Sequence, residues 1–147
     1  MEYSLDDSLL HLLHRASQVA SDIFAEEQRT GSITPRQFVV LAAVASSEGL
    51  NQTEIVDRTG IDRSTMADIV RRLLRKGLLS RKRTIEDERA YAVKLTAQGQ
   101  TVLEQTRATA RRSENRLLAA LATHSQVELI VSLHKLIQVL QHRPAQK

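Results

Sequence analysis

Ten basic side chains lie within about a quarter of the chain, where they could bind the phosphates of a nucleic acid. From residue 61 to residue 96 the sequence has ten Lys and Arg against five Asp and Glu, a local net charge of +5. The other residues have eleven against twelve, a net charge of −1. A cationic patch on an otherwise balanced protein is the electrostatic footprint of a surface that faces phosphates.

Helical spacing organises these residues in the segment IDRSTMADIVRRLLRKG, residues 61–77. At about 100° per residue, one face is apolar, and we expect it to be buried; it carries Met66, Ile69, Val70, Leu73 and Leu74. The rest of the helix carries the residues that we predict to contact DNA: Arg63, Ser64, Thr65, Asp68, Arg71, Arg72 and Arg75. Such a helix is about 21 Å long and suits one pass through a major groove, which admits an α-helix.

Two aspartates in this basic segment require separate explanations. Asp62 has the position of an N-cap, where its carboxylate accepts hydrogen bonds from free N–H groups and favours the positive end of the helix dipole. Asp68 lies one turn further on and faces outward. It could read a base, by accepting from cytosine N4 or by orienting an arginine toward guanine. It could also form a surface ion pair with Arg71 or Arg72, and both roles can hold together.

Helix-start and helix-stop signals make the basic helix the second of a helix-turn-helix. Asn51 and Glu54 have the spacing of a capping box, and the short helix that they begin ends near Gly60. A short helix, a tight turn with glycine and a longer basic helix form the helix-turn-helix arrangement. An earlier start signal is TPRQ, residues 34–37. We therefore expect helices over residues 5–28, 35–49, 52–60 and 63–76.

A β-hairpin, or wing, is predicted after the basic helix. LLSRKR (residues 78–83) and YAVKLT (residues 91–96) are separated by the polar loop TIEDERA. In the second strand, Tyr91, Val93 and Leu95 alternate with other residues, the pattern of a half-buried strand. Two further helices are expected over residues 97–122 and 126–142. The fold class is therefore mainly α, a winged helix-turn-helix with a two-stranded β-wing and additional N- and C-terminal helices, for which the family resemblance given below implies a role in dimerisation.

The sequence has no motif that indicates catalysis, a cofactor or a metal site. We find no nucleophile–base motif, no Gly-rich phosphate loop and no zinc signature, so we do not expect an enzyme. The absence of cysteine excludes disulfides and thiolate zinc sites. His11 and His14 are three residues apart, but no carboxylate lies at a suitable spacing, and metal sensing needs clustered ligands.

Composition also bears on other partners and on location. Aromatic residues make up only 3% of the chain, which argues against the base-stacking surfaces of single-strand or RNA-binding proteins. There is no run of 18 or more apolar residues, and no signal peptide precedes MEYSLDDSLL. We therefore expect a soluble, cytoplasmic protein with no membrane partner.

The order of these elements and three motifs resemble the MarR family of bacterial transcription regulators. The stretch DERAYAVKLT matches the family's wing signature, D-x-R followed after five residues by L-T, at Asp87, Arg89, Leu95 and Thr96. GIDRSTMADIVRRLLRKGLLSR is similar to the family's recognition helix and its exit into the wing. ITPRQFVVLAAV resembles the start of the family's second helix. The likeness covers nearly the whole chain.

The resemblance implies a homodimeric regulator that binds palindromic double-stranded DNA. Residues 34–96 would form the DNA-binding domain, and residues 1–33 and 97–147 the helical dimerisation region. From the wing, Arg83 and Arg89 would contact DNA, with Arg89 in the minor groove and Asp87 bracing the loop. Repression is the family's commoner mode of action.

Two features of the sequence modify this picture. Broad apolar arcs over residues 5–24 and 126–140 would bury against the partner chain, although they could instead close the core of a monomer. Between Arg89 and Leu95 the wing has AYAVK, less basic than in many members, with Glu86 and Glu88 at its tip. We expect weaker binding in the minor groove and a larger share of the affinity from the helix.

The family resemblance also implies a small-molecule effector. Such regulators commonly release DNA when a small, often aromatic and anionic, ligand binds, and we predict an aromatic carboxylate or its thioester. His11, His14 and Arg15 lie on the polar side of the first predicted helix and could meet such a carboxylate, or they could be exposed or form hydrogen bonds in the dimer interface. Without cysteine, the peroxide-sensing mode of some relatives is excluded.

The alternative function is a winged-helix module that binds another protein and not DNA. Such a module would not need Ser64, Thr65, Asp68 and Arg72 to face outward together. Duplex binding that weakens with salt distinguishes the two functions, because phosphate contacts release counterions.

Overall fold

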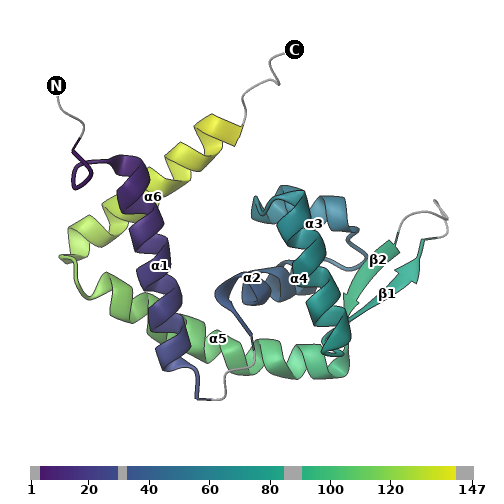
Figure 1. Cartoon of the computed structure of the whole chain (residues 1–147). Helices are drawn as coiled ribbons and strands as arrows, with labels where there is room; N and C mark the ends of the chain where they lie inside the picture. The colour runs from purple at the N-terminus through teal and green to yellow at the C-terminus, as the bar shows by residue number, and fades with distance from the viewer. Residues whose placement is uncertain (1–3, 30–32, 85–90, 142–147) are drawn as a thin grey trace, which may run out of the picture.

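The computed structural model describes residues 4–29, 33–84 and 91–141, and they form six helices and one two-stranded sheet (Figure 1). The elements in chain order are α1 (Leu9–Glu27), α2 (Pro35–Ser46), α3 (Gln52–Thr59), α4 (Arg63–Arg75), β1 (Leu79–Arg83), β2 (Tyr91–Leu95), α5 (Ala97–Leu118) and α6 (Thr123–Gln141). The predicted fold class is confirmed. α3 and α4 form the helix-turn-helix, and β1 and β2 form the wing.

The long helix α5 connects two parts of the molecule (Figure 1). Its first turns pack against α2 and β2, beside the helix-turn-helix and the wing. Further along, α5 packs against α1. After α5 the chain turns sharply, and α6 runs back toward the N-terminal end of α1 (Figure 1).

A single core cluster holds the helix-turn-helix and the wing together. Its fully buried side chains come from four helices and include Leu41 of α2, Ile55 of α3, Met66 and Leu73 of α4, and Leu103 of α5. The strands contribute one residue each, Leu79 and Val93. The core therefore draws on every element from α2 to α5.

Capping side chains decide where α1, α2 and α3 begin. The predicted capping box at Asn51–Glu54 is present, and the predicted start signal at residues 34–37 also forms a capping box, between Thr34 and Gln37. The first helix begins at Leu9 and not at residue 5 as predicted, because the Ser8 hydroxyl accepts the N–H of His11. The apolar periodicity that indicated an earlier start continues into residues that are not helical.

Two predicted helix ends were also too late. α2 ends at Ser46, before Gly49, whose φ is +76°. α5 ends at Leu118 and not near residue 122. The Gln126 side chain of α6 donates hydrogen bonds of 2.9 Å to the carbonyls of Leu118 and Leu121. Leu118 is the last residue of α5 and Leu121 lies between the two helices, so the side chain stabilises the corner between α5 and α6.

The antiparallel strands pair in the register Leu79–Leu95 to Arg83–Tyr91. The wing is also tied to the start of α3, because the Val93 N–H donates to the Leu50 carbonyl at 2.8 Å. Asn51, the N-cap of α3, forms an isolated bridge with Ala92. The hairpin is thus anchored at the end that lies nearest to the core.

The first turn of α5 lies directly on the turn between α4 and β1. The Thr96 hydroxyl donates to the Gly77 carbonyl at 2.6 Å and accepts the N–H of Gly99 at 2.9 Å. A Cβ placed on Gly99 would be 2.0 Å from the Leu78 carbonyl oxygen. Glycine inside a helix costs about 1 kcal/mol relative to alanine, and this close approach of two backbones explains why it is needed here.

No single helix in the described ranges is long and apolar enough to cross a membrane. α5 and α6 reach that length and composition only as a pair bent by 113°.

The N-cap of α4 is the predicted Asp62. Its carboxylate accepts the Thr65 N–H at 2.9 Å and the Ser64 hydroxyl at 2.8 Å. The hydrogen bonds with Thr65, and then the one with Ser64, hold the pKa of Asp62 well below its usual range. The cap is therefore a charged carboxylate across the neutral pH range.

Replacing Gly99 by alanine should destabilise the protein, because the methyl group must displace the Leu78 backbone. Forced overpacking costs about 1–3 kcal/mol, and a fixed backbone oxygen places the variant at the upper end of that range. Chemical denaturation measures the loss. The control is Gln98→Ala, at an exposed position of the same turn, where we expect a change within about 0.5 kcal/mol. Equal stabilities for Gly99→Ala and the wild type would contradict the close packing.

Removing the cap with Asp62→Ala should lower the melting temperature and speed amide exchange at Thr65. Asp62→Asn keeps a good capping side chain and is the matched control. Because folding lowers the pKa of Asp62, its charge stabilises the fold above the unfolded pKa, and this contribution is lost as the pH falls through the folded value. The difference in melting temperature between wild type and Asp62→Ala should therefore narrow in acid. A difference that is constant from pH about 7 to about 3 would contradict this role of the charge.

Candidate nucleic-acid interface

The two faces of α4 separate as the sequence predicted. Four apolar side chains are buried, namely Met66, Ile69, Val70 and Leu73, and Leu74 is half-buried against the core. The predicted contact residues Arg63, Ser64, Arg71, Arg72 and Arg75 are exposed, and Thr65 and Asp68 are half-buried. All seven therefore lie on the outer side of one helix that the core holds in place. Whether they contact DNA stays a prediction.

Asp68 lies among the arginines and forms ion pairs with two of them. Its Oδ2 is 2.8 Å from Nε of Arg72, and its Oδ1 is 3.4 Å from a terminal nitrogen of Arg71. The predicted surface pair on α4 is thus confirmed. The shorter contact has the length of a charge-assisted hydrogen bond, so Arg72 is the main partner. The base-reading role of Asp68 stays a prediction.

The wing has a cluster of two arginines and a tyrosine. Arg83 Nε donates to the Tyr91 hydroxyl at 3.3 Å, and the guanidinium carbons of Arg81 and Arg83 lie 5.0 and 5.8 Å from the centre of the tyrosine ring. The hydrogen bond from Arg83, together with its charge, lowers the pKa of Tyr91. Cation–π contacts at these distances hold both guanidinium groups over one ring, which orients the predicted contact residue Arg83.

The alternation predicted for β2 placed Tyr91 on the buried face of the strand with Val93 and Leu95, and this was wrong for Tyr91, which is exposed. Tyr91 pairs with Arg83 at the end of the hairpin that lies away from the core, whereas Val93, two residues further along β2, is buried in the core. Arg81 was not among the predicted contact residues. Its place in the basic run RKR, residues 81–83 of the predicted wing, was the signal that could have identified it. The predicted wing-tip residues Asp87 and Arg89 lie outside the described residues.

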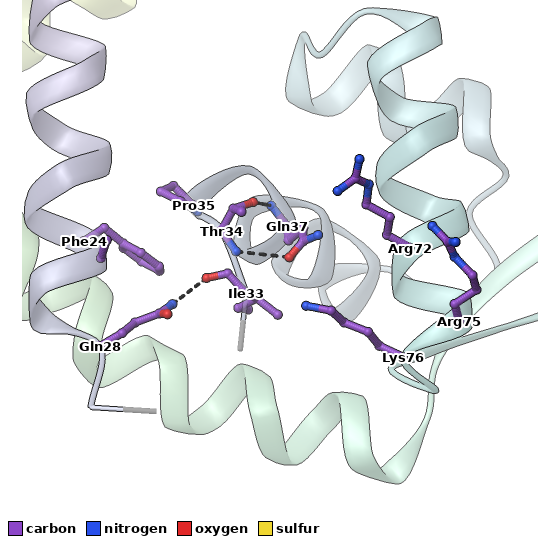
Figure 2. Close-up of a pocket in the computed structure, with 10 residues that line it drawn as sticks. Phe24, Gln28, Ile33, Thr34, Pro35, Gln37, Arg72, Arg75 and Lys76 are labelled. Atoms are coloured by element: carbon purple, nitrogen blue, oxygen red, sulfur yellow. Dashed lines mark hydrogen bonds between the residues drawn. The ribbon is translucent and has the colours of Figure 1, made fainter. Parts of the chain in front are cut away.

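A cavity of about 590 Å³ separates α4 from α1 and the start of α2 (Figure 2). Its volume is in the range of small-molecule sites, about 300–1,000 Å³. The residues that line it are Phe24, Ala25, Gln28, Ile33, Thr34, Pro35, Gln37, Arg72, Arg75 and Lys76. Arg72 and Lys76 extend from α4 toward the residues of α2 in Figure 2.

The chemistry of this cavity differs between its walls. Phe24, Ile33 and Pro35 supply apolar surface, whereas α4 and its C-cap supply three cationic side chains. No Asp or Glu is among the described residues that line it. Several of its polar groups are already bonded within the protein, including the Gln28 amide, which donates to the Ile33 carbonyl at 2.5 Å. The arrangement suits a flat, partly apolar molecule that carries a negative charge.

The structure does not bring the predicted effector residues His11, His14 and Arg15 into this cavity. They lie in the first two turns of α1, with His11 half-buried and the other two exposed. Their role in ligand binding stays a prediction. Gln28 and Lys76 were not predicted to line a cavity. Both follow the last turn of a helix, and no residue pattern indicated that two such helix ends would face one space.

Ion pairs fix the α1 wall of the cavity to α5. Arg112 Nε is 3.1 Å from a carboxylate oxygen of Glu27, and another Arg112 nitrogen donates to the Glu27 carbonyl at 3.1 Å. Arg116 lies 2.7 Å from Glu26, and this contact raises the pKa of Arg116. Exposed pairs contribute little individually. Here the last turn of α1 forms several contacts with one face of α5, which fixes its position.

The described part of the chain has no cluster of three or more His, Asp or Glu side chains that could hold a metal ion.

Comparison with known proteins agrees with this architecture. The sequence pattern that defines the MarR family matches residues 32–90 of this chain. The HTH-type transcriptional repressor NicR of Pseudomonas putida is 28% identical over 135 residues, which cover 92% of this chain and 85% of NicR.

Two solved structures are also similar. A probable transcriptional regulator from Pseudomonas aeruginosa superposes with a TM-score of 0.84 and 30% identity, over 91% of this chain and all of that chain. BpsR of Bordetella bronchiseptica, whose DNA binding is regulated by 6-hydroxynicotinic acid, gives a TM-score of 0.87 and 26% identity, over 94% of this chain and 99% of that chain.

The matched segment contains the helix-turn-helix, and the structural likeness extends over the terminal helices as well. This chain therefore belongs to the MarR family of winged helix-turn-helix transcription regulators.

Proposed function

We propose that the protein is a homodimeric repressor that binds a palindromic DNA duplex and releases it when a small aromatic acid occupies the cavity beside α4. The observation that carries the proposal is the outer face of α4. Three exposed arginines, Arg71, Arg72 and Arg75, project from a helix whose other face is buried. A major groove admits one such helix, and the cationic side chains match its phosphates.

Within this proposal, the residues predicted to contact DNA have different roles. Arg63, Ser64, Thr65 and Asp68 lie in the first half of α4, where helix-turn-helix proteins contact base edges. Asp68 can accept from cytosine N4 while it orients Arg71 or Arg72 toward guanine. From the wing, Arg83 adds a contact with DNA and Arg89 enters the flanking minor groove, while Asp87 braces the loop. Arg75 lies at the far end of α4, where a phosphate contact is the expected role.

The proposal of a dimer is supported by apolar surface that this chain leaves uncovered. Every described α6 side chain from residue 127 to residue 140 is exposed, and they include Ile130, Leu133, Ile137 and Leu140. The first turns of α1 also expose leucines, among them Leu9 and Leu10. A large exposed apolar patch marks an interaction site. A second copy of the chain is the partner we propose, because a symmetric dimer matches a palindromic site.

The effector class follows from the cavity. An aromatic ring can pack on Phe24 and Pro35, and a carboxylate can pair with the cations from α4 and its C-cap. NicR is a repressor, and BpsR is regulated by 6-hydroxynicotinic acid, an aromatic acid. Those two properties belong to the relatives, and they support an acid of this class as the effector here. A thioester of such an acid is the variant we propose if the free acids do not act.

A duplex selected from random sequences should bind with strong salt dependence. A protein with 6–10 phosphate contacts loses about 10³–10⁵-fold in affinity between about 50 and 200 mM salt. Arg71→Ala should cost about 1–3 kcal/mol if the side chain reads a base, with relaxed preference at one position. Fluorescence anisotropy with the selected and scrambled duplexes measures both effects.

The control for Arg71→Ala is Arg107→Ala on α5. Arg107 pairs with Glu104 three residues earlier at 3.4 Å, the same spacing and distance as Arg71 and Asp68. It should leave duplex binding unchanged. Duplex binding that is absent, or that does not depend on salt, would contradict the proposal and favour a module that binds another protein.

Dimer formation should depend on the apolar face of α6. The double variant Ile130→Glu with Leu133→Glu places two charges in the proposed interface, and we expect the dimer dissociation constant to rise at least about 100-fold, or about 2.7 kcal/mol. Sedimentation of both proteins at micromolar concentration measures the change. The control is Gln98→Glu, which adds a charge in the first turn of α5, at the end of that helix away from α6. A monomeric wild type, or an unchanged dimer in the double variant, would contradict the proposed interface.

A further inference from the structure

Arg72 belongs to two sites at once. Its Nε lies 2.8 Å from the Asp68 carboxylate, on the side of α4 proposed to meet DNA. The same side chain lines the cavity, and its guanidinium extends from α4 toward Thr34 and Gln37 in Figure 2. No other residue of α4 both lines the cavity and pairs with an acid among the described contacts.

Arg72 neutralises most of the negative charge of the Asp68 carboxylate. Its second partner, Arg71, is 3.4 Å away, beyond the range of about 2.7–2.9 Å of a strong charge-assisted bond. The Asp68 side chain is 42% exposed, so its charge reaches the surface. An acid without a partner on a phosphate-facing surface is repelled by the DNA backbone. Whether Arg72 pairs with Asp68 therefore decides how strongly the Asp68 carboxylate is repelled by the DNA backbone.

The cavity provides a competing position for the Arg72 guanidinium. Arg75 and Lys76 lie on the same wall, and the described lining contains no carboxylate. A ligand carboxylate bound between them is attracted by three cations at once. Charge interactions strengthen as water is displaced from a partly enclosed site, so an anion packed on Phe24 can compete with the partly exposed carboxylate of Asp68.

We propose that Arg72 couples the two sites: an anionic ligand in the cavity takes its guanidinium from Asp68, and the Asp68 carboxylate, left with only the longer contact to Arg71, then opposes DNA binding. This inference rests on the proposed function and specifies how the effector acts. A ligand shifts an equilibrium only through a difference in its interactions with the two states. Here the difference is one ion pair. By linkage, DNA that favours the Asp68–Arg72 pair weakens binding of the acid by the same factor.

The decisive variant is Asp68→Asn, which removes the charge and keeps the size of the side chain. Three aromatic acids serve as probes, namely 6-hydroxynicotinate, 4-hydroxybenzoate and benzoate, and the one with the largest thermal shift on the wild type is used. In the wild type this acid should weaken duplex binding by a factor in the usual range of about 5–150-fold. In Asp68→Asn the acid should bind more tightly, because it does not have to break an ion pair between Arg72 and residue 68. Its effect on the affinity for the variant's own selected duplex should nearly vanish.

Arg71→Ala is the matched control on the same helix. Arg71 is the other partner of Asp68 but does not line this cavity. This variant should bind the acid as the wild type does, and the acid should still weaken its duplex binding by at least the wild-type factor. A second readout is the Nε–H resonance of Arg72, assigned through Arg72→Lys. The acid should shift it in the wild type as the guanidinium changes partner.

The outcomes separate the inference from the function on which it rests. If Asp68→Asn binds its duplex and the acid still weakens that binding by the full wild-type factor, the coupling through Arg72 is wrong, and the regulator itself stands. If the wild type binds no duplex, or none of the three acids or their thioesters weakens its binding, the proposed function fails and the inference fails with it. Tighter acid binding together with lost coupling in Asp68→Asn supports the inference.

Discussion

Met66 and Leu73 lie seven residues apart on one side of α4, and neither has solvent-exposed surface. Full burial of such a side chain is worth about 1.5–3 kcal/mol, so a helix fixed at two points two turns apart cannot rotate about its axis without a large loss. Rotation would also carry arginines into the core, where an unpaired charge is costly. The direction of every polar side chain on α4 therefore follows from this apolar stripe. The charges of α4 provide the chemistry, and the stripe determines where they point.

The cavity depends on a second constraint, the position of α1. α1 makes no part of the core cluster, and its last turn is held against α5 by Glu26 and Glu27 through Arg112 and Arg116. Phe24 also contributes, since its ring lies 6.2 Å from that of Phe38 in α2. One wall of the cavity thus belongs to the helix-turn-helix and the other to the terminal helices. A molecule bound there contacts both parts of the fold.

The sequence predicted the elements better than it predicted the spaces between them. Capping residues such as Thr34, Asn51 and Asp62 act through neighbours three residues away, so their roles could be identified from local spacing. The outward face of α4 followed from helical periodicity. The need for glycine at position 99 could not be predicted, because its partner, the Leu78 carbonyl, is distant in sequence.

The cavity could not be predicted for a similar reason. Its walls come from three helices, and their arrangement depends on contacts such as Arg112–Glu27, which are 85 residues apart. The histidines near the start of α1 were predicted to meet an effector because of their chemistry. The cavity instead lies at the other end of that helix. Periodicity shows which side of a helix is polar, but it does not show which end meets a neighbour. The exposed Tyr91 has the same cause, since strand alternation does not reveal where a hairpin extends past its core.

The contact between Gly99 and Leu78 has a mechanical consequence. Gly99 packs against the Leu78 carbonyl and Thr96 is bonded to Gly77 across the same junction, and these contacts hold the end of α4, the start of β1 and the first turn of α5 together. These elements form a rigid arm, and a tilt of α5 carries the reading helix and the hairpin through the same angle. In the proposed dimer, a small change of angle at the terminal helices would change the distance between the two α4 helices. The spacing of the DNA half-sites would then be the quantity to which the long helix responds.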